Sequence, residues 1–174
     1  VAQGSQHDFY ALVHNPNSDL MALVNFRFVG PSYESPWLQG FVPPAEDMYL
    51  TWLGVTLPHA LTAIRVELQE IRFRRAPHYQ KEKATWIPFH TSDITHTSES
   101  TGTPLTHFIL HNEGTASFTT LPLLMVVLQG NRTVGLRTVT LQNVMAFSQR
   151  SVEVRWFEPL PTTNLSLRIM PLIN

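Results

Sequence analysis

The sequence predicts an all-β protein: a single jelly-roll sandwich or barrel of about 8–10 antiparallel strands, spanning residues 1–174 as one β-barrel domain. Apolar and polar residues alternate with a period of two from end to end, and turn-forming residues separate these segments. No long stretch follows the 3.6-residue period of a helix. A chain of 174 residues buries enough surface to need no disulfides, which agrees with its lack of cysteine.

Four strands are expected in the first half, at residues 8–14, 20–29, 48–57 and 62–75. A long loop, residues 31–44, separates the second from the third. In the fourth strand the apolar face slips by one residue, from Leu68 to Ile71. A β-bulge near Gln69 and Glu70 explains that slip and bends the strand. A helix over residues 62–75 is the alternative, but the isoleucine, valine and phenylalanine content favours a strand.

The second half begins with a short edge strand at residues 84–90, which contains Pro88. A serine- and threonine-rich loop follows at 91–104. One hairpin is expected from 105–111 and 115–121, and another from 123–128 and 134–147. Strands at 151–157 and 165–173 complete the set. No repeat period or linker is visible. An immunoglobulin-like sandwich is the alternative architecture, although it needs fewer strands.

The charge of the chain argues against a nucleic-acid-binding surface. The net charge is −1, from 12 basic and 13 acidic residues. Charged residues make up only 14%, against about 25% in an ordinary soluble domain. A surface so poor in charge is partly covered by neutral polar residues or by a neighbouring subunit. The most apolar stretch, residues 121–128, is much shorter than the ~20 residues that span a bilayer, so the protein is not expected to cross a membrane.

Several predicted strands are apolar on both faces and therefore need cover on both sides. Residues 123–128 contain no polar position, and the last segment, 165–173, is an apolar terminal strand suited to pairing with the sheet edge of a partner. These features predict a homo-oligomer, a dimer or larger, with an exchanged terminal strand as one form of it. The residues assigned to the core or to an interface are Trp37, Phe41, Leu123, Leu124, Met125, Val126, Leu165 and Ile169.

Histidines are the candidates for a metal site. His107 and His111 share one face of a predicted strand, and His90 and His96 flank the preceding loop. A metal site needs three or four converging ligands with supporting hydrogen bonds. The His-x-His pattern of cupins, followed by Glu, is absent. Polar surface or interface histidines are the simpler interpretation, and neither a metal nor another cofactor is expected.

Paired carboxylates are the candidates for glycoside hydrolysis, as Glu67 with Glu70 or Glu153 with Glu158. Basic neighbours at spacing two, such as Arg65 beside Glu67, indicate charge pairs on a solvated sheet instead. Nucleophile and phosphate-binding motifs are missing from the sequence. We therefore expect no enzyme and no small-molecule substrate.

A carbohydrate-binding β-sandwich is the alternative function. Exposed tryptophan and tyrosine rings present flat apolar faces to sugars, and Tyr33 and Trp37 lie in a proline-rich loop that would expose them. Trp52 and Trp156 lie within alternating strands and are expected in the core.

The chain as a whole resembles the smaller single-jelly-roll major capsid proteins of the tailless, icosahedral, internal-membrane bacteriophages of Thermus. The resemblance rests on the strand series from residue 8 to 173, on connections such as Gly30-Pro31 and Val42-Pro-Pro44, on the bare strand 123–128 and on the absence of cysteine. Ten arginines against two lysines suit a GC-rich, thermophilic host.

The resemblance implies a structural virion protein, made in the host cytoplasm and located in the capsid. Such a protein forms an upright β-barrel that assembles with itself and with a second, larger capsid protein into an icosahedral shell. It lies close to an internal membrane without spanning it. That membrane separates the shell from the genome, so no direct contact with nucleic acid and no basic arm are implied.

Overall fold

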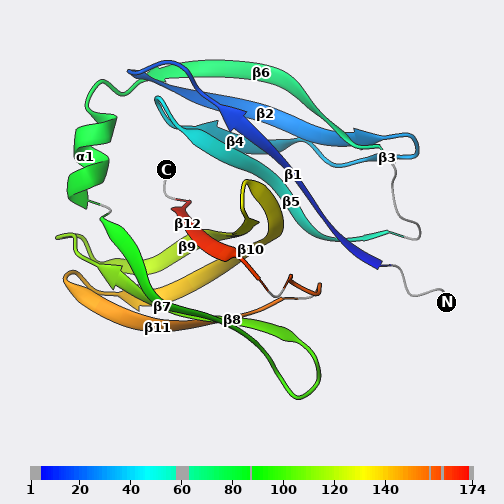
Figure 1. Cartoon of the computed structure of the whole chain (residues 1–174). Helices are drawn as coiled ribbons and strands as arrows, with labels where there is room; N and C mark the ends of the chain where they lie inside the picture. Colours follow the sequence, from blue (N-terminus) through cyan, green and yellow to red (C-terminus); the bar gives the residue numbers. More distant parts are fainter. Residues whose placement is uncertain (1–4, 58–62, 87, 157, 162, 173–174) are drawn as a thin grey trace. The chain divides into compact units, whose positions relative to one another are not determined.

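The computed structural model describes residues 5–57, 63–86, 88–156, 158–161 and 163–172. These residues form an almost entirely β structure of antiparallel strands (Figure 1). The predicted all-β class, with antiparallel sheets packed as sandwiches, is confirmed and is consistent with a jelly-roll-like fold. The chain divides into two compact units, Val1–Lys81 (unit 1) and Glu82–Asn174 (unit 2). The single barrel over residues 1–174 stays a prediction.

Unit 1 contains a two-stranded ribbon and a four-stranded sheet. In the ribbon, β1 (Ser5–His14) pairs with β5 (Asp47–Leu57). In the sheet, β2 (Leu20–Gly30) lies between β4 (Leu38–Val42) and β6 (Arg65–Arg75), and the two-residue β3 (Tyr33–Glu34) pairs with the end of β2. Alternate β2 side chains are buried and form the inner face of the sheet, which follows from the period-two pattern: Ala22, Val24, Phe26 and Phe28.

The bulge predicted in the fourth strand is confirmed. Asn25 pairs with Glu70 and the next residue, Phe26, pairs with Leu68, so Gln69 is the extra residue. The helical alternative for residues 62–75 is wrong where the structure describes them, because 65–75 are strand β6. The expected loop at 31–44 is also wrong: β3 and β4 lie within it, because Leu38–Val42 continues the pairing of β2 on the side away from β6.

Unit 2 is a sandwich of two three-stranded sheets. One has the order β11-β8-β7, formed by β11 (Ser148–Arg155), β8 (Pro104–Asn112) and β7 (Phe89–Ser98). The other has the order β10-β9-β12, formed by β10 (Arg132–Val144), β9 (Phe118–Gln129) and β12 (Leu165–Pro171). The predicted hairpin of 123–128 with 134–147 is confirmed as the β9–β10 pair.

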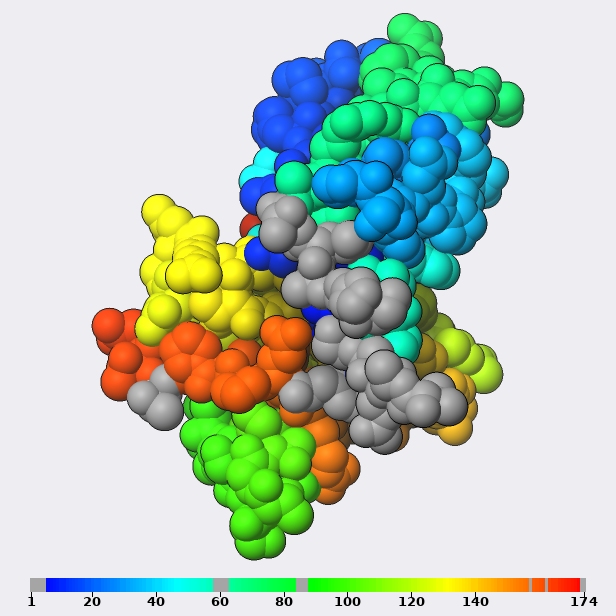
Figure 2. Space-filling view, turned by 90° about the vertical axis from the view of Figure 1, so that its right-hand side faces the viewer, coloured from blue at the N-terminus to red at the C-terminus, as the bar shows by residue number. Residues whose placement is uncertain are grey.

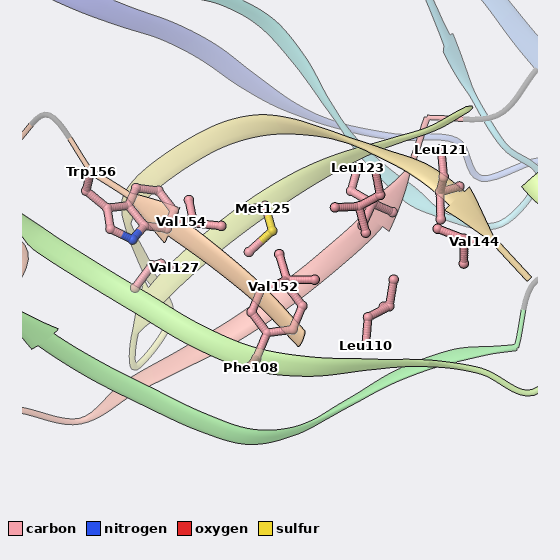
Figure 3. Packing of buried hydrophobic residues seen from close by; sticks show 11 residues of the cluster. Phe108, Leu110, Leu121, Leu123, Met125, Val127, Val144, Val152, Val154 and Trp156 are labelled. Carbon is pink, nitrogen blue, oxygen red and sulfur yellow. The ribbon is translucent and has the colours of Figure 1, made fainter. Parts of the chain in front are cut away.

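The core of unit 2 lies between these sheets (Figure 3). Phe108 and Leu110 enter it from β8, Leu123 and Met125 from β9, and Trp156 closes one end. Phe108, Leu123 and Met125 have no exposed surface. Trp156 is a core residue as expected, and its Nε1 donates a 2.8 Å hydrogen bond to the hydroxyl of Thr106.

Three other expectations for the second half are wrong. The short strand expected at 84–90 is wrong in its first part, because residues 84–86 belong to helix α1 (Tyr79–Trp86), whose lysine, glutamate and alanine favour helix; Phe89 and His90 instead begin β7. Residues 91–104 are not one loop, since β7 runs through Ser98 and its threonines favour strand. Residues 105–121 do not form a hairpin, because β8 and β9 belong to different sheets.

The strand boundary expected near residue 122 is also absent, because β9 continues through Pro122. Pro122 lies one residue beyond the last pair of the β9–β12 ladder, Leu123 with Pro171. The Pro122 carbonyl still accepts the N–H of Leu172 at 2.9 Å, and a residue without an N–H is tolerated here because the position lies at the end of the β9–β12 ladder.

The two units share one strand connectivity, although no repeat period is visible in the sequence. In unit 1, β1 pairs with β5, and β2 pairs with both β4 and β6. In unit 2, β8 pairs with β11, and β9 pairs with both β10 and β12. Each strand of the first set has a counterpart at the same place in the order of the second. Each unit has one strand outside this shared set: the two-residue β3 in unit 1, which pairs with the end of β2, and β7 in unit 2, which pairs with β8.

A buried asparagine closes the same corner in both units. Asn15 follows β1; its Nδ2 donates to the carbonyls of Leu20 and Val42, and its Oδ1 accepts the N–H of Asn17. We call each such asparagine, with its bonds, an asparagine bracket.

The second bracket ends β8. Asn112 Nδ2 donates to the carbonyls of Ala116 and Met145, and its Oδ1 accepts the N–H of Gly114. Asn15 is 3% exposed and Asn112 is 1% exposed. Both brackets therefore join backbone groups from separate segments at the corner through one buried side chain.

Candidate interaction surface

Three large apolar side chains of β6 are exposed in unit 1. Leu68, Ile71 and Phe73 are 43%, 48% and 56% exposed. They pair across the sheet with Phe26, Val24 and Ala22, all of which are buried on the inner face. Paired residues in a sheet point to the same side. These three side chains therefore lie on the inner face of the sandwich and are nevertheless exposed; we call them the β6 apolar face.

The counterpart strand in unit 2 differs in burial. On β12, Leu165, Leu167 and Ile169 lie on the inner face and are partly buried against the core cluster. In unit 1 the layer opposite the sheet has only two strands, β1 and β5, whereas in unit 2 it has three. The third strand, β7, is the one without a counterpart in the described part of unit 1.

The edge of β1 adjoins this missing position. Among the described residues β1 pairs only with β5, and its other edge carries no strand. Natural proteins protect such edges with charges, prolines or bulges. The central stretch of β1, from Phe9 to Val13, has none of these, and Leu12 is 54% exposed. A bulge between His7 and Phe9 interrupts only the beginning of the strand.

Histidines gather on the outer face of the β11-β8-β7 sheet. The rings of His90 and His111 stack with centroids 4.2 Å apart. His111 Nε2 lies 2.9 Å from the Ser92 hydroxyl, and His90 Nδ1 lies 3.5 Å from Glu113 Oε1. In the sequence His90 and His111 belong to two separate predicted strands; pairing of β7 with β8 brings them into register.

These histidines do not form a metal site within the residues that the structure describes, where no three potential ligands converge. His107 Nε2 lies instead 2.8 Å from the Ser151 hydroxyl. A serine beside a histidine is also the beginning of a nucleophilic pair. Within the described part of the chain, no carboxylate bonds to the second ring nitrogen of His107 or His111. Neither pair therefore has the orienting group that a triad requires.

His96 lies apart from the other histidines, on the inner side of β7. Its Nδ1 lies 2.8 Å from the Thr106 hydroxyl, which also accepts the Trp156 N–H. Its Nε2 is buried without a partner. Burial lowers the pKa of His96, because removal from water disfavours the charged imidazolium.

The candidate carboxylates are engaged in ion pairs. Glu67 contacts Arg65 at 2.8 Å and Arg27 at 2.9 Å. Hydrogen bonds from Arg65 first and Arg27 second lower the pKa of Glu67, which favours a permanently charged carboxylate over a general acid.

The other pairs follow the same pattern. Glu70 pairs with Arg72, and Glu153 with Arg155, at 2.8 and 2.9 Å. Glu158, the remaining candidate, is exposed. This arrangement matches the expected charge neighbours on a solvated sheet.

The two aromatic residues proposed for sugar binding are placed differently. Tyr33 packs against Phe9 at 5.5 Å, and its hydroxyl accepts a 2.7 Å bond from Trp52 Nε1. Trp37 is 43% exposed, and the Arg27 guanidinium lies 4.8 Å from its ring centre. Trp37 is thus the more exposed of the two rings, and the Arg27 guanidinium already lies over its ring.

The residues assigned to core or interface fall into three groups. Leu123 and Met125 lie in the core of unit 2. Leu124 and Val126 point to the opposite face of β9 and are also fully buried. The remaining four are partly covered or exposed: Leu165 and Ile169 on the inner face of β12, Phe41 on β4, and Trp37.

The predicted terminal strand pairs within its own chain. Leu165–Pro171 forms β12 beside β9. The position that an exchanged strand was expected to fill in a partner is therefore occupied intramolecularly.

Sequence reasoning missed the β6 apolar face and the asparagine brackets. The period-two pattern of β6 correctly assigns its apolar residues to one face, but their exposure depends on the number of strands in the opposite layer, which no local pattern reports. The sequence does contain a pattern that marks the asparagine brackets: His14-Asn15 and His111-Asn112 both end an alternating apolar strand and are followed by turn residues.

No protein-family model matches this chain, and no curated protein is recognisably similar to it in sequence. Among the helices of the described residues, none has the length and apolar character needed to cross a membrane.

Proposed function

We propose that this protein is a structural building block that assembles with copies of itself and with other proteins. The observation that carries the proposal is the β6 apolar face, whose three large side chains lie on the inner side of a sandwich and remain 43–56% exposed. A monomer gains nothing from leaving such residues in water, whereas an assembled protein buries them. In the form implied by the resemblance to phage capsid proteins, the assembly is a virion shell shared with a larger second capsid protein.

The energetics favour an assembly with additional contacts. Covering the remaining exposed half of three large apolar side chains contributes about 3 kcal/mol, since complete burial of one is worth about 1.5–3 kcal/mol. Micromolar association requires about 8 kcal/mol. The β6 apolar face therefore acts together with main-chain pairing or a second patch, as in multivalent shells.

Light scattering over a dilution series, at low and high salt, tests this proposal. The expected result is a dimer or larger species that persists at micromolar concentration and is unaffected or strengthened by salt, because its contacts are apolar. Ile71→Lys should reduce the mass to that of a monomer. Met145→Lys is the matched control, since Met145 is 59% exposed in unit 2. A monomer at every concentration contradicts the proposal.

A carbohydrate-binding module is the second candidate, and the exposure of Trp37 supports it. Saturable binding on a glycan array that is lost in Trp37→Ala, but retained in Ile71→Lys, would favour this function over assembly.

A further inference from the structure

We infer that unit 1 accepts an extended strand from another polypeptide, added antiparallel to β1 at the place that β7 occupies in unit 2. This inference rests on the proposed assembly function and specifies the kind of contact involved. The occupant is a segment in β conformation with apolar side chains at alternate positions.

The first argument is topological. Five strands of unit 1 correspond to five strands of unit 2 in order and in pairing, and the asparagine brackets occupy the same corner. In unit 2, β7 runs antiparallel to β8, the counterpart of β1. A strand that pairs antiparallel with β1 therefore completes in unit 1 the arrangement that the same chain already forms in unit 2.

The second argument is burial. A strand beside β1 lies over β6, as β7 lies in the layer opposite β12. The inner-face residues of β12 are partly buried, while Leu68, Ile71 and Phe73 on β6 are exposed. In the space-filling view the upper group of green atoms, which includes the β6 segment, lies at the surface (Figure 2), and the exposed fractions of Leu68, Ile71 and Phe73 show that this surface includes the β6 apolar face. The surface left uncovered is thus the one that the missing strand would cover.

The third argument concerns the backbone. Among the described residues β5 is the only strand that pairs with β1, so the opposite edge of β1 is a place where an added strand can form main-chain hydrogen bonds. A whole sandwich joined edge to edge does not fit this position. The sheet containing β6 extends one strand further than the β1–β5 ribbon, so a partner's opposite layer would overlap β6. A single extended segment is the occupant that fits.

The chemistry of the segment follows from its surroundings. Its inward residues face Leu68, Ile71 and Phe73 and are therefore apolar, with no charge, because an unpaired charge would be buried there. Its outward residues lie beside Leu12 on the outer face of the β1–β5 ribbon. Because Leu12 is exposed there, this face sets no requirement on the polarity of the outward residues.

The test uses the full chain and a synthetic peptide of 11 residues, the length of β6. The peptide has valine at alternate positions, threonine between them and a lysine at each end. Amide hydrogen exchange is measured for β1 with and without peptide. Those β1 amides that do not bond to β5 should exchange at least about tenfold more slowly when peptide is added. A control peptide with serine in place of every valine should leave exchange unchanged.

Phe73→Asp should abolish the protection, because it places a charge against the inward valines, whereas Met145→Asp in unit 2 should retain it. A tethered variant of the protein tests the same contact without depending on the affinity of a free peptide. In this variant the same valine strand is joined to the N-terminus through a copy of the Glu99–Thr103 turn, which links β7 to β8.

Unchanged exchange of the β1 amides with both the peptide and the joined strand overturns the inference. Protection by the serine peptide, or protection that persists in Phe73→Asp, also overturns it. Light scattering of the unmodified chain separates the two proposals: self-association without strand binding contradicts only the added strand, and a monomer that binds the peptide contradicts only self-assembly.

Discussion

Replacement of Asn112 by alanine should destabilise unit 2 by about 3 kcal/mol. The side chain is 1% exposed and makes three hydrogen bonds to backbone groups, at 2.9, 2.8 and 3.1 Å. Each bond contributes about 1 kcal/mol net, and alanine can replace none of them. The carbonyls of Ala116 and Met145 and the N–H of Gly114 would be left without these partners.

The effect is measurable by thermal and denaturant unfolding. For a unit of this size, 1 kcal/mol moves the melting temperature by about 4–8 °C, so a decrease of roughly 12–24 °C is expected for the transition of unit 2. Asn131→Ala is the matched control, since Asn131 is exposed in the turn between β9 and β10. It should change the melting temperature by no more than a few degrees, within the roughly 0.5 kcal/mol typical of surface substitutions.

The reasoning is refuted if Asn112→Ala costs less than about 1 kcal/mol, or no more than Asn131→Ala. Either result would mean that water or a shifted turn replaces the hydrogen bonds of Asn112 without loss of stability in unit 2. Asn15→Ala provides an independent repetition in unit 1, because Asn15 bonds to the carbonyls of Leu20 and Val42 in the same manner.

Three further predictions concern pH and packing. Burial lowers the pKa of His96 in the folded state, so the unfolded chain binds its proton first on acidification. The stabilisation from neutral His96 should be complete above about pH 6.5 and should decline as pH falls toward the lowered folded pKa. Between about pH 7.5 and 5, the denaturant midpoint of wild type should therefore fall relative to that of His96→Gln, and a difference that does not change in this direction would contradict the prediction. Gly40→Ala should lower the free energy of unfolding by about 1–3 kcal/mol, because the added Cβ would lie 2.9 Å from Cδ2 of the buried Leu50. The control Gln39→Ala, at the exposed neighbouring residue, should leave the free energy of unfolding nearly unchanged. Phe108→Ala should lower the free energy of unfolding by about 3–5 kcal/mol, since Phe108 has no exposed surface in the core of unit 2. A loss of less than about 1 kcal/mol in urea unfolding would mean that the core collapses around the cavity.

The sequence predicted those parts of the fold that depend on local alternation. Strands β2, β5 and β6 are recognisable from their period-two pattern, and the slip between Leu68 and Ile71 predicts the bulge at Gln69. The β9–β10 hairpin follows from a turn between two apolar runs. In each case the signal lies within a few residues of the feature it reports.

Other features depend on contacts between distant segments. The pairing of β7 with β8 turns a polar, threonine-rich segment into a strand, and nothing local distinguishes it from a loop. Helix α1 lies in a window whose lysine, glutamate and alanine content favours helix, but the proximity of Pro88 suggested an edge strand instead. The exposure of Phe73 follows only from counting the strands in the opposite layer.

The shared connectivity of the two units has a consequence for how the chain acquires its structure. During synthesis β1 and β2 emerge before β8 and β9, and the partner strands β5 and β11 occupy equivalent positions in their units. Adjacent domains of similar topology are prone to misassembly, in which a strand of one pairs with the partner of the other. The core-facing residues of the corresponding strands differ: β1 directs Phe9, Ala11 and Val13 to its core, whereas β8 directs Thr106, Phe108 and Leu110 to its own. A strand placed in the wrong unit would present side chains that do not match that core, and the same differences explain why the shared connectivity is not visible in the sequence.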